Sequence, residues 1–457
     1  MTETLQEDIT GNPHLLGESD IKKLLLEYSL PAIVGMVIVS LYHIVDSIFI
    51  GHGIGALAIS GMAITFPVMN ILSAFSTLIG VGGATLTSIR LGKKEEKGAA
   101  SILGHVTLLN TVNALLLAGI TYCFLEPVLR AFGASDALLP YARDFMSVYL
   151  WGTPIIFVFI ALNNIMRVSG YPRKAMMSSF VSVGLNVILA PLFIFVFKWG
   201  MKGTALATVL AQLLGLIWVL SHFLDKKSYI HFTKGFHRLS FKTTKSMLSI
   251  GISPFLMNLC LGLVVFFINI GLMKHGGDLA VGAYGIINRI LTLFIMVVVG
   301  LTMGMQPIAG YNYGAKEIAR TFEVLKYTLL WGVSVMTFGF LVSEWFPHFI
   351  VKMFTTDREL VNISARGLRI AIAMFPLAGA QIVISNFFQS IGKVKISIFL
   401  SLSRQLIFLL PLLLILPNFW GVDGVFLSLS VADFIAFVVT ALTFIYQLKR
   451  MKRKLER

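Results

Sequence analysis

An aspartate lies inside one of the most apolar stretches of this chain. Residues 40–58 read SLYHIVDSIFIGHGIGALA, so that Asp46 is surrounded by Leu, Ile, Val and Phe. A charge at the centre of a membrane helix costs about 2.5–3.5 kcal/mol on insertion scales, and such residues usually face a bundle interior or a cavity. Burial raises the pKa of a carboxyl group toward the range in which it exchanges protons near neutral pH. Asp46 is therefore predicted to bind and release a proton; the alternative is a structural carboxylate near the membrane surface.

Two neighbours of Asp46 could take part in the same chemistry. His43 precedes it by three residues, which places both on one face of a helix. Because histidine titrates near neutral pH, His43 either relays protons with Asp46 or is a packed, hydrogen-bonded side chain. Tyr42 is expected to line the same region.

The composition shows which elements must hold these residues. Of 457 residues, 56% are hydrophobic and 13% are charged, and the mean hydropathy is +0.84. Soluble domains have about 25% charged residues, so the sequence indicates an all-α integral membrane protein with helical spans of about 20 residues or more. Twelve spans are predicted, at 24–50, 57–89, 99–125, 138–168, 174–198, 203–223, 245–273, 279–311, 321–345, 360–391, 395–417 and 421–447.

The formal net charge of +15 is distributed unevenly. Most of the Lys and Arg residues fall on one side of the predicted membrane, which is the cytoplasmic side by the positive-inside rule. Both termini are then cytoplasmic, and the protein is expected in the cytoplasmic (inner) membrane. The basic segments at 225–245 and 449–457 are interpreted as contacts with membrane lipid. No nucleic-acid partner is expected.

The sequence contains an internal duplication with an offset of 221 to 223 residues. LGKKE at 91–95 matches YGAKE at 313–317, NNIMRVSG at 163–170 matches SNFFQSIG at 385–392, and WGMKG at 199–203 matches WGVDG at 420–424. Six spans in each copy give both copies the same orientation, with a pathway expected between them. The pattern predicts two pseudo-symmetric six-helix bundles, an architecture typical of transporters and not of enzymes.

This reading divides the chain into five parts. They are a cytoplasmic N-terminal segment at 1–23, an N-lobe at 24–223, a cytoplasmic linker at 224–245, a C-lobe at 246–447 and a basic tail at 448–457.

Several segments resemble the multidrug and toxic compound extrusion (MATE) transporters. LEYSLPAIVGMVIVSLYHIVDSIFIGHGIGALA at 26–58 resembles the family's first helix, and MQPIAGYNYGAKE at 305–317 resembles the end of its eighth. LNVILAPLFIF at 185–195 and GTALATVLAQ at 203–212 are similar to the fifth and sixth helices. The resemblance implies the MATE fold and export of amphipathic, often cationic compounds driven by inward flow of protons or sodium ions.

The resemblance also implies roles for single residues. Asp46 matches the coupling aspartate of proton-driven members, while Asn186 and Thr208 match polar positions that line the N-lobe and help to hold that aspartate. Many members carry a second aspartate four residues after the asparagine, where this chain has Ala190. That departure leaves Asp46 as the main acid of this lobe, with His43 as a possible partner.

The coupling ion follows from the second half of the chain. A sodium-linked branch of the family carries acids in its seventh and tenth helices, and the corresponding stretches here contain none. Protons are therefore favoured and sodium ions are the alternative; no cofactor and no metal are expected.

Other polar residues in the spans have two interpretations each. Asp433 is equivalent by repeat to Gln212, and it either serves as a second protonation or cation site or pairs with Arg289 or Arg404. Arg289 either lines the pathway or balances a charge. Gln212 is expected to line the cavity.

The sequence thus predicts a monomeric proton-coupled exporter whose lobes rock against each other, with Pro31 and its repeat equivalent Pro254 as hinge candidates. A sodium-driven exporter is one alternative. The other is a lipid-linked precursor flippase of the same superfamily, for which Arg289, Arg366, Arg369 and Arg404 would supply a cationic cavity.

Overall fold

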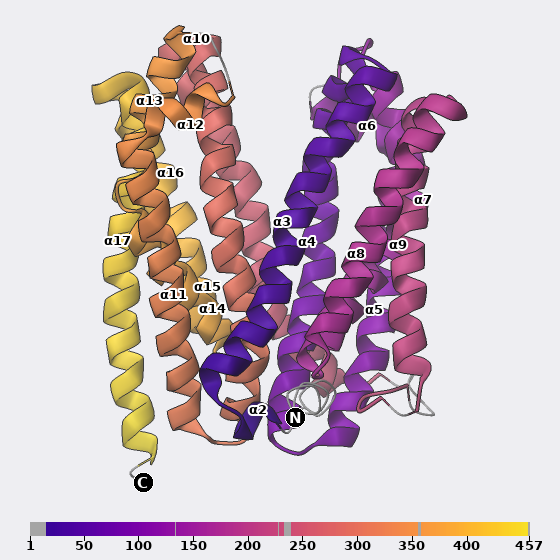
Figure 1. Cartoon of the computed structure of the whole chain (residues 1–457), viewed down its shortest axis with the longest axis vertical. Helices are drawn as coiled ribbons and strands as arrows, with labels where there is room; N and C mark the ends of the chain where they lie inside the picture. Colours follow the sequence, from indigo (N-terminus) through magenta and orange to yellow (C-terminus); the bar gives the residue numbers. More distant parts are fainter. Residues whose placement is uncertain (1–14, 133, 227, 233–238, 355–357, 456–457) are drawn as a thin grey trace, which may run out of the picture.

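The computed structural model describes residues 15–132, 134–226, 228–232, 239–354 and 358–455. Within these ranges the chain is helical and contains no β-strand. Helices α3 to α9 lie on one side and α10 to α17 on the other, and the first and last described helices, α2 and the final turns of α17, lie at the same end of the molecule, which we call the termini end (Figure 1). We refer to α3–α9 as the first bundle and to α10–α17 as the second bundle.

The first bundle follows the predicted spans closely. Its long elements are α3 (Ile21–Gly53), α4 (Ala56–Gly92), α5 (Glu96–Cys123), α7 (Leu139–Val168), α8 (Pro172–Pro191) with η1 (Leu192–Val196), and α9 (Gly200–Leu224). Short helices α2 (Leu15–Glu18) and α6 (Leu125–Ala131) stand before α3 and between α5 and α7.

The second bundle begins with α10 (Phe241–Gly314), which is interrupted at Gly277, where φ is +61°. It continues with α11 (Ile318–Trp345), α12 (Pro347–Lys352), α13 (Arg358–Ile372), α14 (Phe375–Ser390), α15 (Val394–Leu402), η2 (Ser403–Leu409), α16 (Leu410–Ile415) and α17 (Pro417–Leu455). The span predicted at 360–391 is observed as two helices, α13 and α14, which are bent by 51° relative to each other. Pro376 lies at the start of α14, and proline disfavours a helical residue before it.

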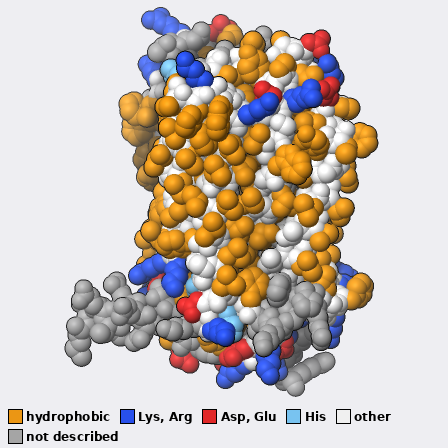
Figure 2. Space-filling model, turned by 90° about the vertical axis from the view of Figure 1, so that its right-hand side faces the viewer, with side chains coloured by type: hydrophobic (Ala, Val, Ile, Leu, Met, Phe, Trp, Pro, Cys, Tyr) orange, Lys and Arg blue, Asp and Glu red, His pale blue; other side chains and the backbone are white. Residues whose placement is uncertain are grey.

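The helices are suited to a membrane. Ten helices in the described part of the chain are long and apolar enough to cross one, or eleven if the bent pair α13–α14 counts as one span. Helix α3, with 33 residues, covers the first predicted span, so the predicted fold class is confirmed. Hydrophobic side chains cover the middle of the surface in Figure 2, whereas charged side chains gather at its two ends.

The backbone torsion angles also show the internal duplication. Residues with positive φ recur at the repeat spacing, as the pairs Gly55 and Gly277, Lys94 and Lys316, Gly170 and Gly392, and Gly200 and Gly421. Positive φ is uncommon for residues other than glycine, so its presence at both Lys94 and Lys316 indicates that the two copies turn in the same way after α4 and α10.

The packing differs between the two ends of the molecule. At the termini end one hydrophobic cluster includes residues of both bundles, among them Leu91, Ile165, Ile308 and Tyr311. Toward the opposite end each bundle has a cluster of its own, one containing Phe145 and the other Phe426. Among the described residues, the two bundles therefore share a hydrophobic core only at the termini end.

Backbone-to-backbone contact brings the bundles together there. A Cβ atom on Gly251 of α10 would clash with the carbonyl oxygen of Leu78 in α4, and one on Gly82 would clash with that of Met247. Polar bonds also cross the interface. Gln306 Nε2 donates to Thr85 Oγ1 at 2.7 Å, and Ser88 Oγ donates to the carbonyl of Pro307 at 2.8 Å. Small residues permit this approach of α4 and α10.

Gly251→Ala is expected to lower the melting temperature of the detergent-solubilised protein, because the added methyl group must push α4 and α10 apart. Overpacking of this kind costs about 1–3 kcal/mol. Gly119→Ala is the matched control, since a Cβ there would meet no atom within 4 Å. Equal melting temperatures for the two variants would contradict this account of the interface.

The segment between the bundles is fixed to the first of them. Tyr229 donates its hydroxyl to Glu96 Oε1 at 2.6 Å, and the backbone N–H of Ser240 donates to His105 Nε2 at 2.7 Å. Burial, together with the hydrogen bond to Glu96, raises the pKa of Tyr229 above its ordinary value. Tyr229 therefore stays a neutral hydrogen-bond donor at physiological pH.

Candidate functional site

Asp46 lies in the first bundle on α3, a helix without an interruption at this point. Its side chain is buried, with 5% of its surface exposed. The carboxylate oxygen Oδ1 has no hydrogen-bond partner among the residues that the structure describes. Buried polar atoms are nearly always paired, so an unpaired carboxylate oxygen calls for a functional explanation.

The side chains of Tyr42 and His43 lie outside the described residues. Their predicted roles beside Asp46 therefore stay predictions. The backbone of both residues belongs to α3.

Asn186 and Thr208 are brought together by neighbouring helices. Asn186 Nδ2, on α8, donates to Thr208 Oγ1, on α9, at 3.1 Å. The Oδ1 atom of Asn186 is buried without a partner among the described residues, and so is Oε1 of Gln212, one turn beyond Thr208 on α9. The family-derived positions Asn186 and Thr208 thus form a contact.

A small apolar cluster fixes the neighbourhood of these polar groups. It contains Ala190 of α8 and Ala207 of α9, with Phe49 of α3 packed against it. Asp46 lies one helical turn before Phe49, Asn186 lies one turn before Ala190, and Thr208 follows Ala207 directly. Asp46, Asn186 and Gln212 thus lie on three helices, α3, α8 and α9, that pack against one another.

Ala190 occupies the position at which many family members carry a second aspartate. It is fully buried and packs in the apolar cluster just described. The local chemistry therefore offers one carboxylate and two amide oxygens, with no second acid on this face of α8.

The second bundle holds a different arrangement at the equivalent helices. Arg404, in η2, donates from Nε to Asp433 Oδ1 of α17 at 2.5 Å, and both side chains are largely buried. Of the two predicted pairings, Asp433 forms the one with Arg404. The π-helical turn of η2 is a feature often found at functional sites, and here it presents the guanidinium to Asp433.

Asp433→Ala is expected to destabilise the protein strongly, because it leaves the Arg404 charge buried without a partner. Breaking a buried ion pair costs about 3–5 kcal/mol, whereas replacing both partners by apolar residues is often neutral. The double variant Arg404→Met, Asp433→Leu should therefore recover most of the melting temperature in detergent. Loss of transport by Asp433→Ala at an unchanged melting temperature would show instead that the carboxylate acts in transport.

Three other predicted residues are placed as follows. Arg289 lies exposed on α10 and forms no ion pair with any residue that the structure describes. Pro31 and Pro254 lie within the continuous helical stretches of α3 and α10. Their predicted roles as lining residue and hinges stay predictions.

Sequence reasoning missed Gln306, whose amide joins α10 to Thr85 of α4. The signal was present, since a polar residue inside a long apolar span rarely faces lipid. Its partner could not be inferred, because the contact depends on which faces of α4 and α10 pack together.

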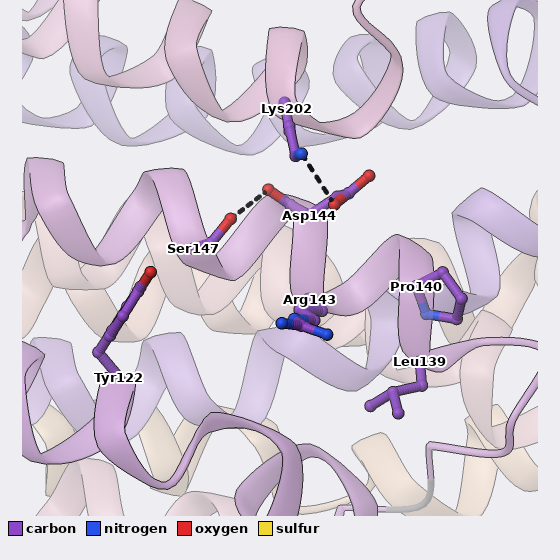
Figure 3. A pocket seen from close by; sticks show the side chains of 7 residues that line it. All are labelled: Tyr122, Leu139, Pro140, Arg143, Asp144, Ser147 and Lys202. Atoms are coloured by element: carbon purple, nitrogen blue, oxygen red, sulfur yellow. Dashed lines mark hydrogen bonds and ion pairs between the residues drawn. The ribbon is translucent and has the colours of Figure 1, made fainter.

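A pocket at the end opposite the termini is separate from this region. The pocket is lined by side chains from the ends of α5, α7 and α9 (Figure 3), namely Tyr122, Leu139, Pro140, Arg143, Asp144, Ser147 and Lys202. Lys202 Nζ lies 3.4 Å from Asp144 Oδ1, and Arg143 pairs with Glu126 at 2.7 Å. Its charges are therefore balanced within the first bundle, and none of the predicted site residues lines it.

Comparison with known proteins gives the family. The family model MatE matches residues 31–192 and matches again at 254–415. The two matches begin 223 residues apart, as the internal duplication requires. The chain belongs to the MatE family and is a membrane transporter, not an enzyme.

Individual relatives and solved structures align with nearly the whole length of this chain. The multidrug export protein MepA of Staphylococcus haemolyticus is 27% identical over 436 residues, which cover 94% of this chain and 95% of that protein. The solved structure of the MATE multidrug transporter DinF-BH, determined with a bound compound, is 34% identical with a TM-score of 0.86, covering 93% of this chain and 95% of that one. The crystal structure of MATE in the bent conformation gives a TM-score of 0.93 at 23% identity, covering 98% and 100% of the two chains.

Proposed function

We propose that this protein exports amphipathic, cationic small molecules across the cytoplasmic membrane in exchange for protons. The observation that carries the proposal is the group of buried acceptor oxygens on Asp46, Asn186 and Gln212, which have no partner among the described residues. Three acceptors without a donor favour the arrival of a proton or a cation, either of which supplies the missing positive partner. The relatives MepA and DinF-BH, which are a multidrug export protein and a multidrug transporter, support the substrate class.

Asp46 is the group that exchanges the proton in this proposal. When it is protonated, its O–H can donate to an amide oxygen such as that of Asn186, and no net charge stays buried. When it is ionised, the site carries a negative charge that attracts a cationic substrate and disfavours burial without one. Proton and substrate therefore compete for the same carboxylate, which is what exchange requires.

Rocking of the two bundles completes the cycle. In the state described here the bundles share a core at the termini end, so the pathway is proposed to open toward the other end. Protonation of Asp46 there releases the substrate. Opening toward the termini end then lets the proton leave and a new substrate bind.

The proposed orientation places both termini in the cytoplasm, in agreement with the positive-inside distribution of Lys and Arg. The end opposite the termini is then the outer end. The proposed working unit is one chain, since the pathway lies between its own two bundles.

Sodium coupling is the second candidate, because the same carboxylate and amide oxygens are ligands that a sodium ion accepts. The flippase alternative is less well supported. Of the arginines considered for a cationic cavity, Arg366 pairs with Asp423, Arg369 with Glu344, and Arg404 with Asp433. Guanidinium groups already paired with carboxylates offer little to a pyrophosphate.

The test is efflux of a fluorescent cationic dye from vesicles that contain the purified protein. An imposed pH gradient in sodium-free buffer is expected to drive transport, and a sodium gradient at equal pH is not. Transport that requires sodium and ignores the pH gradient would replace the proton by sodium as coupling ion. Transport under neither gradient would contradict ion-coupled drug export.

A further inference from the structure

The segment before the first long helix crosses from one bundle to the other. Helix α2 and the two residues after it, Leu15–Asp20, lead directly into α3 of the first bundle. Asp20 caps the start of α3 by accepting from the backbone N–H of Lys23, whereas the carbonyl groups of Leu16 and Ser19 accept hydrogen bonds from side chains of the second bundle. We call residues 15–20 the N-terminal segment.

Two side chains of the second bundle donate hydrogen bonds to backbone carbonyl groups of the N-terminal segment. Asn312 Nδ2, on α10, donates to the carbonyl of Leu16 at 2.8 Å. Arg320, on α11, donates from Nη2 to the carbonyl of Ser19 at 2.5 Å and to that of Leu16 at 3.5 Å. Arg320 Nε also donates to Asn312 Oδ1 at 3.2 Å, which fixes both side chains for this task.

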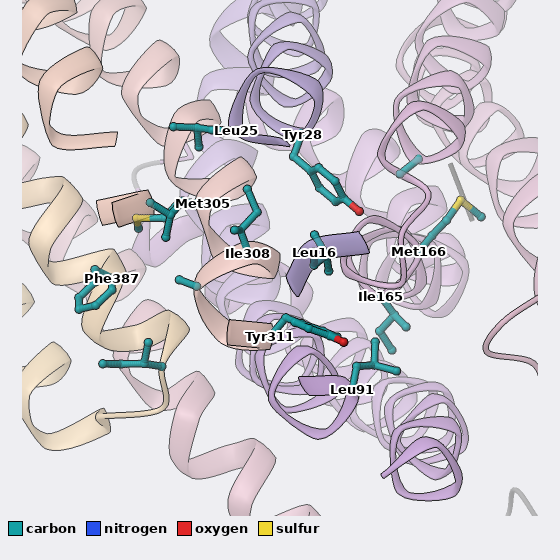
Figure 4. Close-up of a cluster of buried hydrophobic side chains, with 14 of the residues drawn as sticks. Leu16, Leu25, Tyr28, Leu91, Ile165, Met166, Met305, Ile308, Tyr311 and Phe387 are labelled. Carbon is teal, nitrogen blue, oxygen red and sulfur yellow. The ribbon is translucent and has the colours of Figure 1, made fainter. Parts of the chain in front are cut away.

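The side chain of Leu16 is equally engaged. It is 1% exposed and belongs to the cluster shared by the two bundles. Figure 4 shows it between Ile308 and Tyr311 on one side and Ile165 and Met166 on the other. Gly17 follows against the Tyr311 ring, where a Cβ atom would lie 3.0 Å from Cε1.

We propose that residues 15–20 act as a latch that holds the termini end of the transporter closed. The segment is covalently tied to the first bundle and hydrogen-bonded to the second, and it fills the space between them. Opening this end requires that Arg320 and Asn312 release the carbonyls and that Leu16 leave the shared core. The latch thus sets how often this end opens, whichever ion drives transport.

A cysteine reporter tests the latch in the full-length chain. Cys123 and Cys260 are first replaced by Ser and Ala, and Met166→Cys is introduced at a fully buried position of the shared core to which Leu16 belongs. In purified protein the reporter should react slowly with a water-soluble maleimide. Arg320→Ala, which removes charge-assisted hydrogen bonds, is expected to raise the labelling rate by about tenfold or more.

Two controls separate the latch from general destabilisation. Arg173→Ala removes an arginine that pairs with Glu27 within the first bundle, and it should leave the labelling rate unchanged. A second reporter, Phe145→Cys, lies in the cluster that belongs to the first bundle alone. Arg320→Ala should not change its labelling, because the latch does not hold that region.

Leu16→Ala provides an independent release of the latch that leaves Arg320 in place, and it should also accelerate labelling of Met166→Cys. If Arg320→Ala fails to fold, the labelling rate of the Leu16→Ala variant tests the latch in its place. Unchanged labelling of Met166→Cys in the folded latch variants would overturn the proposal. Equal acceleration at Met166→Cys and Phe145→Cys would overturn it too, since that pattern means loosening of the whole fold.

Discussion

The double variant Ser88→Cys, Gly310→Cys is expected to form a disulfide between the two bundles and to abolish transport while oxidised. A Cβ atom built on Gly310 of α10 lies 3.0 Å from Cβ of Ser88 in α4. Disulfides join Cβ atoms about 3.5–4.5 Å apart, so a shift of roughly half an ångström suffices. Both residues lie near the ends of their helices, at the termini end where the proposed cycle requires the bundles to separate.

The measurement is efflux of the fluorescent cationic dye from vesicles, in a chain whose Cys123 and Cys260 have been replaced. Efflux should fall to the level of protein-free vesicles after oxidation and return after reduction. The matched control is Gly80→Cys, Ala161→Cys, whose Cβ atoms are 3.1 Å apart between α4 and α7 of the first bundle. That disulfide should leave transport intact. Transport by fully cross-linked Ser88→Cys, Gly310→Cys protein would contradict rocking at this interface.

The second large effect is expected for Asp46→Asn, which should reduce efflux to the background level while the protein still folds. The amide has nearly the same size but cannot exchange a proton. The variant also removes a buried ionisable group whose Oδ1 has no partner among the described residues, so its melting temperature should equal or exceed that of the unmodified protein. Dye efflux and thermal unfolding in detergent measure the two quantities.

Two further variants define what Asp46 contributes. Asp46→Glu keeps a carboxyl group and should retain part of the efflux. Asp423→Asn removes an acid that pairs with Arg366 away from the proposed site and should have little effect. Efflux by Asp46→Asn equal to that of the unmodified protein would remove Asp46 from the coupling step.

Much of the fold was predictable because a membrane imposes simple rules on sequence. Spans need about 20 apolar residues, and the predicted spans accordingly overlap the observed helices. The bend between α13 and α14 was predictable from Pro376 at the start of α14, because prolines inside spans are common places for helices to kink. The duplication was readable from short motifs such as LGKKE and YGAKE, whose lysines Lys94 and Lys316 both have positive φ.

The site was predictable in part. A carboxylate within an apolar stretch of sequence indicated a buried side chain, and Asp46 is buried. The sequence left the partner of Asp433 open between two arginines, because the choice depends on how η2 and α17 face each other. Arg404 forms that contact and Arg289 does not.

The latch had no signal in the sequence. Arg320 and Asn312 bind backbone carbonyl groups of residues 16 and 19, and every residue has such a carbonyl. Only the tertiary arrangement decides which carbonyls face these side chains. The same holds for Gly251 and Gly82, whose close approach to the opposite backbone depends on the crossing of α4 and α10.

The central claim is that Asp46 exchanges protons for a cationic substrate. Its most direct test is the lumenal pH of vesicles that contain the purified protein, followed with a pH-sensitive dye in sodium-free buffer after an outward substrate gradient is imposed. The unmodified protein is expected to acidify the lumen as substrate leaves, and Asp46→Asn is expected to give no change. A pH change of equal size in both proteins, or one that appears only when sodium is added, would contradict the account.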